Sequence, residues 1–149
     1  MEVFNYYAIT DSISTSGQPK AEQFQSIADT GHTVVINLAM PDHERSLANE
    51  GALVTGLGMT YLHIPVPFDS PDESLYQRFS NAMDAMSGKK VWVHCIVNAR
   101  VSAFLFRYLQ SRRGFSAEQA TTPVLTAWRS QMDEVWTEFL KRDAQEGDV

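Results

Sequence analysis

Three short runs rich in apolar and β-branched residues limit most strongly how this chain can fold. They cover residues 34–38, 61–64 and 91–93, and helical patterns lie between them. Apolar runs of this length are typical of strands that lie inside a parallel sheet and are buried on both faces. Strands that alternate with helices predict an α/β fold, in which helices cover both faces of a central, mainly parallel sheet. A further short run starting at Ile13 predicts a sheet of four to five strands.

Apolar residues spaced three and four positions apart predict the helices. The expected helices lie between Pro19 and Gly31, over about 46–57, between Pro71 and Gly88, directly after the loop at Cys95, and in two segments towards the C-terminus. Ser116 and Gln119 have the spacing of a capping box. Residues 143–149 are polar and are expected to form a flexible tail.

The length, the charge and the cysteine content restrict what the chain can do. A chain of 149 residues is expected to form one domain over residues 1–149. Its net charge of −6 disfavours nucleic-acid binding, which needs clustered Lys and Arg. One cysteine excludes an internal disulfide, and the N-terminus lacks the pattern of a signal peptide. We therefore expect a cytoplasmic protein that binds neither nucleic acid nor a membrane.

The segment 91–102 contains the strongest candidate site. A buried strand leads to Cys95, a short loop follows, and a helix begins at once. The amides of such a loop and the helix N-terminus favour a thiolate, and also an oxyanion bound above it. Arg100 adds a planar guanidinium that matches two oxygens of a phosphoryl group, and Ser102 is placed to donate to the sulfur. A cysteine that is merely packed in a core needs none of these neighbours, so Cys95 is the predicted nucleophile.

The pair His94-Cys95, followed by Arg100 and Ser102, resembles the His-Cys…Arg-Ser/Thr phosphate loop of the cysteine-dependent protein tyrosine phosphatase superfamily. The resemblance covers most of the chain. Three further segments resemble the small bacterial, dual-specificity-like branch of that superfamily: 16–19 (Ser-Gly-Gln-Pro), 35–38 and 61–66. The resemblance implies a single phosphatase-like α/β domain.

The resemblance also implies a two-step hydrolysis of phosphomonoesters. The Cys95 thiolate attacks phosphorus to form a phosphocysteine, while Arg100 and the loop amides stabilise the negative oxygens. His94 is implied to orient the loop and to help keep the thiolate. No metal or other cofactor is needed, and the implied partners are a phosphorylated protein or a small phosphate ester, with phosphate or sulfate as a loop ligand. The amides expected to bind phosphate belong to Ile96, Val97, Asn98, Ala99 and Arg100.

A carboxylic acid on a mobile loop is implied to protonate the leaving oxygen and then to activate water. Asp69 is the first candidate, because it follows the strand at 61–66 in a loop rich in proline. Asp72 and Asp42 are the competing candidates, although Asp72 is also placed to cap the next helix.

The candidate loop departs from the superfamily pattern in its spacing. Four residues separate Cys95 from Arg100, where the superfamily has five, and Val101 stands where the arginine is expected. Asn98 replaces a common glycine, and asparagine tolerates the left-handed conformation of a tight turn. Either the loop is one residue tighter and Arg100 still faces the anion, or the loop keeps its register and Arg100 points elsewhere. We favour the tighter loop.

Two other functions are compatible with this spacing. A loop of four residues between Cys and Arg also resembles the rhodanese family, whose cysteine carries a persulfide, and a smaller ring of amides suits a sulfane sulfur. The His94-Cys95 pair and the Ser-Gly-Gln-Pro turn favour the phosphatase instead. The remaining alternative is a catalytically weak or inactive module that only binds oxyanions.

Overall fold

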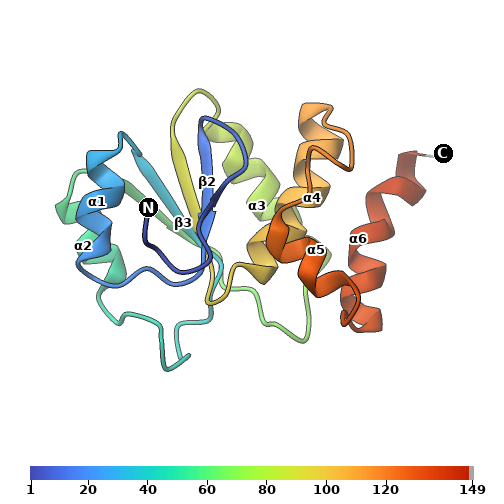
Figure 1. The fold of residues 1–149 in the computed structure, drawn as a ribbon, viewed down its shortest axis with the longest axis horizontal. Helices are drawn as coiled ribbons and strands as arrows, with labels where there is room; N and C mark the ends of the chain where they lie inside the picture. Colours follow the sequence, from blue (N-terminus) through green and yellow to red (C-terminus); the bar gives the residue numbers. More distant parts are fainter. Residues whose placement is uncertain (148–149) are drawn as a thin grey trace.

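The computed structural model describes the backbone of residues 1–147 and the side chains of residues 1–142. Within the described chain the strands form one sheet in the order β1-β2-β5-β3-β4, which confirms the predicted α/β fold class (Figure 1). Four strands run parallel, and β1 is antiparallel to β2. The strands are β1 (Tyr7–Ala8), β2 (Ile13–Ser16), β3 (Val34–Asn37), β4 (Thr60–His63) and β5 (Val91–His94).

The middle strand of the sheet, β5, ends level with its neighbours. His94 is paired in register with Ser16 of β2 and with Asn37 of β3, and Asn37 is paired with His63 of β4. The loops that follow these strands therefore meet at one edge of the sheet, where open parallel sheets bind their ligands. The residue after His94 is Cys95, so the predicted nucleophile lies at the centre of this edge.

Helices cover both faces of the sheet, as the alternating pattern predicted (Figure 1). Successive strand residues point to opposite faces. Val35 and Trp92 therefore pack with Phe24, while Ile36 and Val93 pack in the larger cluster on the other face. On the first face lie α1 (Gln23–Asp29) and α2 (Glu50–Gly56). On the second lie α3 (Glu73–Ala85), α4 (Ala99–Arg113), α5 (Pro123–Arg129) and α6 (Glu134–Gly147).

Two helices begin later than the sequence pattern predicted. The first begins at Gln23 rather than near Pro19, because the Gln23 side chain accepts a hydrogen bond from the Lys20 amide and closes a turn before the helix. The second begins at Glu50 rather than near Ser46, whose hydroxyl donates to a carbonyl earlier in the same loop. Both corrections lengthen loops at the edge of the sheet that carries Cys95.

Two smaller features of the fold differ in how well the sequence predicted them. The two-residue strand β1 was not predicted, because an element this short leaves no periodic pattern. The predicted capping box is confirmed: the Ser116 amide donates to Gln119 at 3.0 Å, and the Gln119 amide donates to the Ser116 hydroxyl at 3.1 Å.

The C-terminal part of the chain ends in α6, whose backbone continues to Gly147. The flexible tail that we predicted at 143–149 lies outside the residues whose side chains the structure describes. Among the helices of the described residues, none combines the length and the apolar character that crossing a bilayer requires.

Candidate active site

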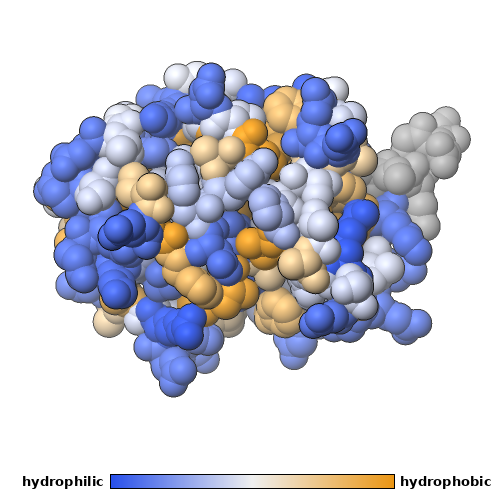
Figure 2. Space-filling view, in the orientation of Figure 1, coloured by the Kyte–Doolittle hydropathy of each residue, from blue (hydrophilic) through white to orange (hydrophobic). Residues whose placement is uncertain are grey.

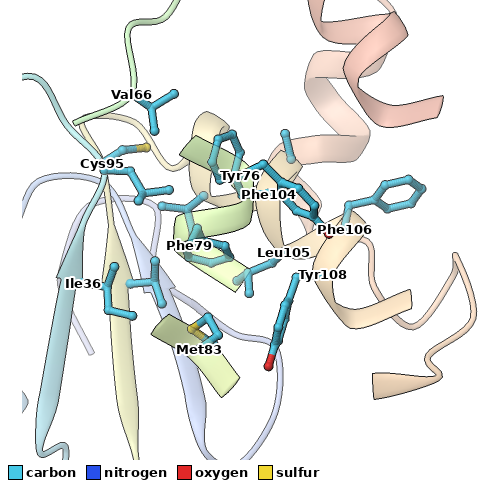
Figure 3. Packing of buried hydrophobic residues seen from close by; sticks show 14 of the residues in the cluster. Ile36, Val66, Tyr76, Phe79, Met83, Cys95, Phe104, Leu105, Phe106 and Tyr108 are labelled. Atoms are coloured by element: carbon cyan, nitrogen blue, oxygen red, sulfur yellow. The ribbon is translucent and has the colours of Figure 1, made fainter. Parts of the chain in front are cut away.

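Cys95 is fully buried at the carboxyl end of β5, where the strand ends and the loop leading to α4 begins. Figure 3 shows it at one end of the hydrophobic cluster, together with Val66 from the segment after β4. The strand, the loop and the helix N-terminus therefore follow one another as the sequence predicted. A sulfur in this position lies at the positive end of the α4 dipole.

A left-handed residue produces the tight turn between the loop and α4. Asn98 is the N-cap of α4 and has φ 74°, which the sequence predicted from the tolerance of asparagine for this conformation. Its side-chain amide donates to the Asn5 carbonyl at 2.9 Å and to the Thr15 hydroxyl at 3.0 Å. Asn98 therefore shapes the loop and also ties it to the N-terminal segment and to β2.

The hydroxyl of Ser102 does not play the part that we expected from the sequence. Its proton goes to the side-chain oxygen of Asn98 at 3.3 Å, and its oxygen accepts from Thr122 at 2.6 Å. A hydroxyl has a single proton, so in this structure the bond to Asn98 replaces the expected bond to sulfur. Ser102 thus links the loop residue Asn98 to Thr122.

The carbonyls of the loop are turned towards the protein. The Ile96 carbonyl accepts from the Gln18 amide at 2.9 Å, and the Val97 carbonyl accepts from the Asn5 side chain at 2.9 Å. In a trans peptide the N–H of the next residue points the opposite way. The amides of Val97 and Asn98 therefore point away from these partners, and in the described part of the chain they have no acceptor of their own. Amides in this state can bind an anion.

Arg100 is held beside the same loop. Its side chain is on the first turn of α4 and only 6% exposed, and its Nη1 donates to the Val66 carbonyl at 2.8 Å. Its guanidinium lies 5.7 Å from the ring centre of Phe68. Its Nε is buried and, within the described residues, unpartnered, which costs about 1–3 kcal/mol or more for a charged group. A buried donor left without an acceptor at this cost favours an anionic ligand as its partner.

The residue before the nucleophile belongs to a buried network that the sequence did not reveal. His94 Nε2 lies 2.7 Å from a carboxylate oxygen of Glu50, and both side chains are almost fully buried. Its Nδ1 lies 3.2 Å from the Cys95 carbonyl. We missed Glu50 because it is separated from His94 by β4 and α3, and nothing in its immediate sequence marks it as buried.

The three candidate acids are all exposed, but their surroundings differ. Asp69 directly follows a short segment that two other side chains hold in place. Arg100 donates to the Val66 carbonyl, and the Trp136 indole donates to the Phe68 carbonyl at 2.7 Å. Asp72 is the N-cap of α3, and its side chain makes no capping hydrogen bond. Asp42 lies in the loop after β3. Asp69 therefore has the most direct structural connection to Arg100.

Among the residues that the structure describes, no group of three or more His, Cys, Asp and Glu side chains is arranged to hold a metal ion. The groups that the site offers for chemistry are the Cys95 thiol, the Arg100 guanidinium, the loop amides and the carboxyl group of Asp69.

Comparisons with known proteins identify solved structures with the same fold. No protein-family model matches the sequence, and no curated protein matches it significantly. A solved structure of a DUF442 protein from Shewanella putrefaciens CN-32, described as a candidate phosphatase, superposes with a TM-score of 0.87. The two sequences are 30% identical, and the match covers 97% of this chain and 91% of that one.

Two more distant structures share the fold. Tk-PTP in its active form has a TM-score of 0.73 and 20% identity, with 93% of this chain and 95% of that chain covered. The core catalytic domain of the S. cerevisiae PP-IP phosphatase SIW14, in complex with citrate, has a TM-score of 0.72 and 11% identity, with 99% and 95% covered.

Proposed function

Because this chain belongs to the cysteine-dependent protein tyrosine phosphatase superfamily, we propose that it hydrolyses phosphomonoesters through a phosphocysteine intermediate on Cys95. The observation that carries the proposal is the arrangement around the loop. A cysteine at the end of the central strand is followed by outward-facing amides of Val97 and Asn98 and by the unpartnered Nε of Arg100. This combination supplies both a nucleophile and donors for the oxygens of a phosphoryl group.

The proposed reaction has two steps. The thiolate of Cys95 attacks phosphorus, an S–P bond forms, and the bond to the ester oxygen breaks. Asp69 in its protonated form gives its proton to that leaving oxygen. The resulting Asp69 carboxylate then removes a proton from water, which attacks phosphorus and releases phosphate as the S–P bond breaks. The loop amides and Arg100 stabilise the equatorial oxygens throughout.

The rim of the site suggests which esters it accepts. Phe4, Phe68 and Val97 are large hydrophobic residues that remain 48%, 46% and 38% exposed. Val97 is in the loop itself, Phe68 faces Arg100, and the Phe4 ring packs beside Gly17 close to the Ile96 carbonyl. Figure 2 shows hydrophobic residues gathered in the lower middle of this face of the molecule. An apolar rim favours esters with an aromatic or apolar leaving group.

Paired assays on purified protein test the proposal. The wild-type protein is expected to hydrolyse an aryl phosphate, and Cys95→Ser is expected to lose this activity while melting at the same temperature. The same preparations are incubated with thiosulfate and then with cyanide. A gain of one sulfur on Cys95 with release of thiocyanate, and no hydrolysis of the phosphate ester, would contradict the proposal in favour of sulfur transfer.

A further inference from the structure

Glu50 is a carboxylate buried beneath the loop that carries the nucleophile. Its side chain is 2% exposed at the start of α2, with one oxygen 2.7 Å from His94 Nε2 and the other accepting from Gln18 Nε2 at 2.8 Å. Burial alone would raise the pKa of Glu50, but its hydrogen bonds with His94, Gln18 and Tyr61 lower that pKa below the ordinary value. Glu50 is therefore ionised, and a buried charge of this kind requires a partner of opposite sign.

The surroundings of His94 determine its protonation. Nε2 faces the Glu50 carboxylate, and Nδ1 faces the Cys95 carbonyl at 3.2 Å. Both neighbours are acceptors, whereas a neutral imidazole has only one N–H to donate. A doubly protonated ring satisfies both contacts and neutralises Glu50, so the hydrogen-bond pattern assigns an imidazolium at this position.

The other groups facing this pair do not supply a competing charge. Tyr61 on β4 interacts with Glu50, and burial followed by the neighbouring carboxylate raises the pKa of its phenol, so it stays neutral. Asn37 donates to the Tyr61 oxygen at 3.0 Å, which leaves the phenol proton for Glu50. On α1, the Phe24 ring meets His94 edge to face. The remaining titratable neighbour is Cys95 itself.

The ion pair is linked to the backbone of the nucleophile. His94 contacts the Cys95 carbonyl with one nitrogen and Glu50 with the other, so the imidazole lies between the carboxylate and the backbone of the nucleophile. A buried positive charge that is hydrogen-bonded to the backbone of the nucleophile favours the thiolate over the thiol. We propose that Glu50 is a positioning residue that keeps His94 doubly protonated and thereby stabilises the Cys95 thiolate.

This role rests on the proposed function only in that Cys95 is the nucleophile, and it is tested without a phosphate ester. The rate of alkylation of Cys95 by iodoacetamide is measured against pH in wild type, Glu50→Gln and Glu73→Gln. Glu73→Gln is the matched control, because it removes a carboxylate from a pair on the opposite side of the sheet. The pH at which the alkylation rate reaches half of its maximum is expected to rise by about one to three pH units in Glu50→Gln. In Glu73→Gln this midpoint is expected to stay unchanged.

A second measurement does not require the variant to fold. Nitrogen NMR of the wild-type imidazole rings at neutral pH is expected to show protons on both nitrogens of His94. A single protonated nitrogen on His94, or an alkylation-rate profile against pH that is the same in Glu50→Gln and wild type, would overturn the role of Glu50. Neither result would affect the proposed function. A wild-type midpoint near the ordinary thiol value of about 8.5 would instead count against the proposed function as a whole.

Discussion

At the scale of single residues, the turn at Asn98 shows why an asparagine can replace a glycine beside the nucleophile. The left-handed conformation is open to both residue types, but only asparagine adds bonds to the Asn5 carbonyl and the Thr15 hydroxyl. Its oxygen also accepts from Ser102. Where a glycine would leave the short loop free to move, the Asn98 side chain fixes it with hydrogen bonds.

Two substitutions at Asn98 separate these contributions. Asn98→Gly keeps the conformation and loses the side-chain bonds, so the free energy of unfolding is expected to fall by about 1–3 kcal/mol. Asn98→Ala loses the same bonds and adds left-handed strain, so it is expected to be less stable than Asn98→Gly by about 1 kcal/mol. Urea unfolding of both variants checks the order. An alanine variant as stable as the glycine variant would contradict the assigned turn.

The guanidinium of Arg100 is predicted to act through its shape as well as its charge. Arg100→Lys keeps a positive charge but loses the donor fork, so kcat/KM for an aryl phosphate is expected to fall by about 10²–10³. Arg112→Lys is the control, because Arg112 lies on the same helix and pairs with Asp84. Steady-state kinetics of both variants decide the point. Equal rates in the two variants would mean that Arg100 does not face the anion.

At the scale of elements, two loops at the edge of the sheet are packed against each other. Gly17 follows β2, and a Cβ built on it would lie 2.5 Å from the Ile96 carbonyl oxygen and 2.7 Å from the Phe4 ring. The next residue, Gln18, donates its amide to that same carbonyl. The loop after β2 thus holds the loop after β5 in place, and a glycine is required for the close approach.

Gly17→Ala is expected to push the Cys95 loop away from β2, because backbone atoms cannot yield to the new methyl group. Both the free energy of unfolding and the turnover of an aryl phosphate are expected to fall. Gly56→Ala, at the end of α2, has open space around its Cβ position and serves as the control. It is expected to be neutral or to stabilise by up to about 1 kcal/mol. Similar losses in both variants would argue against contact between the loops.

At the scale of the whole molecule, the sequence predicted the layers and the central loop better than the contacts between distant segments. Strand runs and helical stripes are local patterns, so the α/β fold and the position of Cys95 followed from them. The partners of His94, Asn98 and Arg100 come from other loops, at Glu50, Asn5 and Val66. No local periodicity encodes such pairs, which is why Glu50 was missed and the expected bond from Ser102 to sulfur was wrong.

The layer formed by α3, α4 and α6 also depends on a long-range ion pair. Buried Arg107 of α4 donates to Glu73 of α3 at 2.7 and 2.9 Å, and Arg142 of α6 adds a third bond at 3.0 Å. The hydrogen bonds from Arg107, opposed by partial burial and assisted by Arg142, lower the pKa of Glu73 to about 2. These three side chains therefore join three helices through one carboxylate.

A carboxylate with a lowered pKa stabilises the fold above its ordinary value of 4.5 and loses that contribution as the pH falls towards about 2. The difference in melting temperature between wild type and Glu73→Gln is expected to be constant at neutral pH. It should shrink between about pH 4.5 and 2 and vanish below that range. Thermal melts at matched ionic strength measure it. A difference that does not change with pH would show that Glu73 contributes through packing instead.

The central claim is that phosphorus becomes covalently bound to the sulfur of Cys95. Wild-type protein is mixed with an aryl phosphate, quenched in acid within the first turnover and digested, and the peptide containing Cys95 is analysed by mass spectrometry. We predict a gain of one phosphoryl group on Cys95 that disappears at later times. Turnover of the ester with the peptide unmodified at every time, or with the phosphoryl group on another residue, would contradict the account.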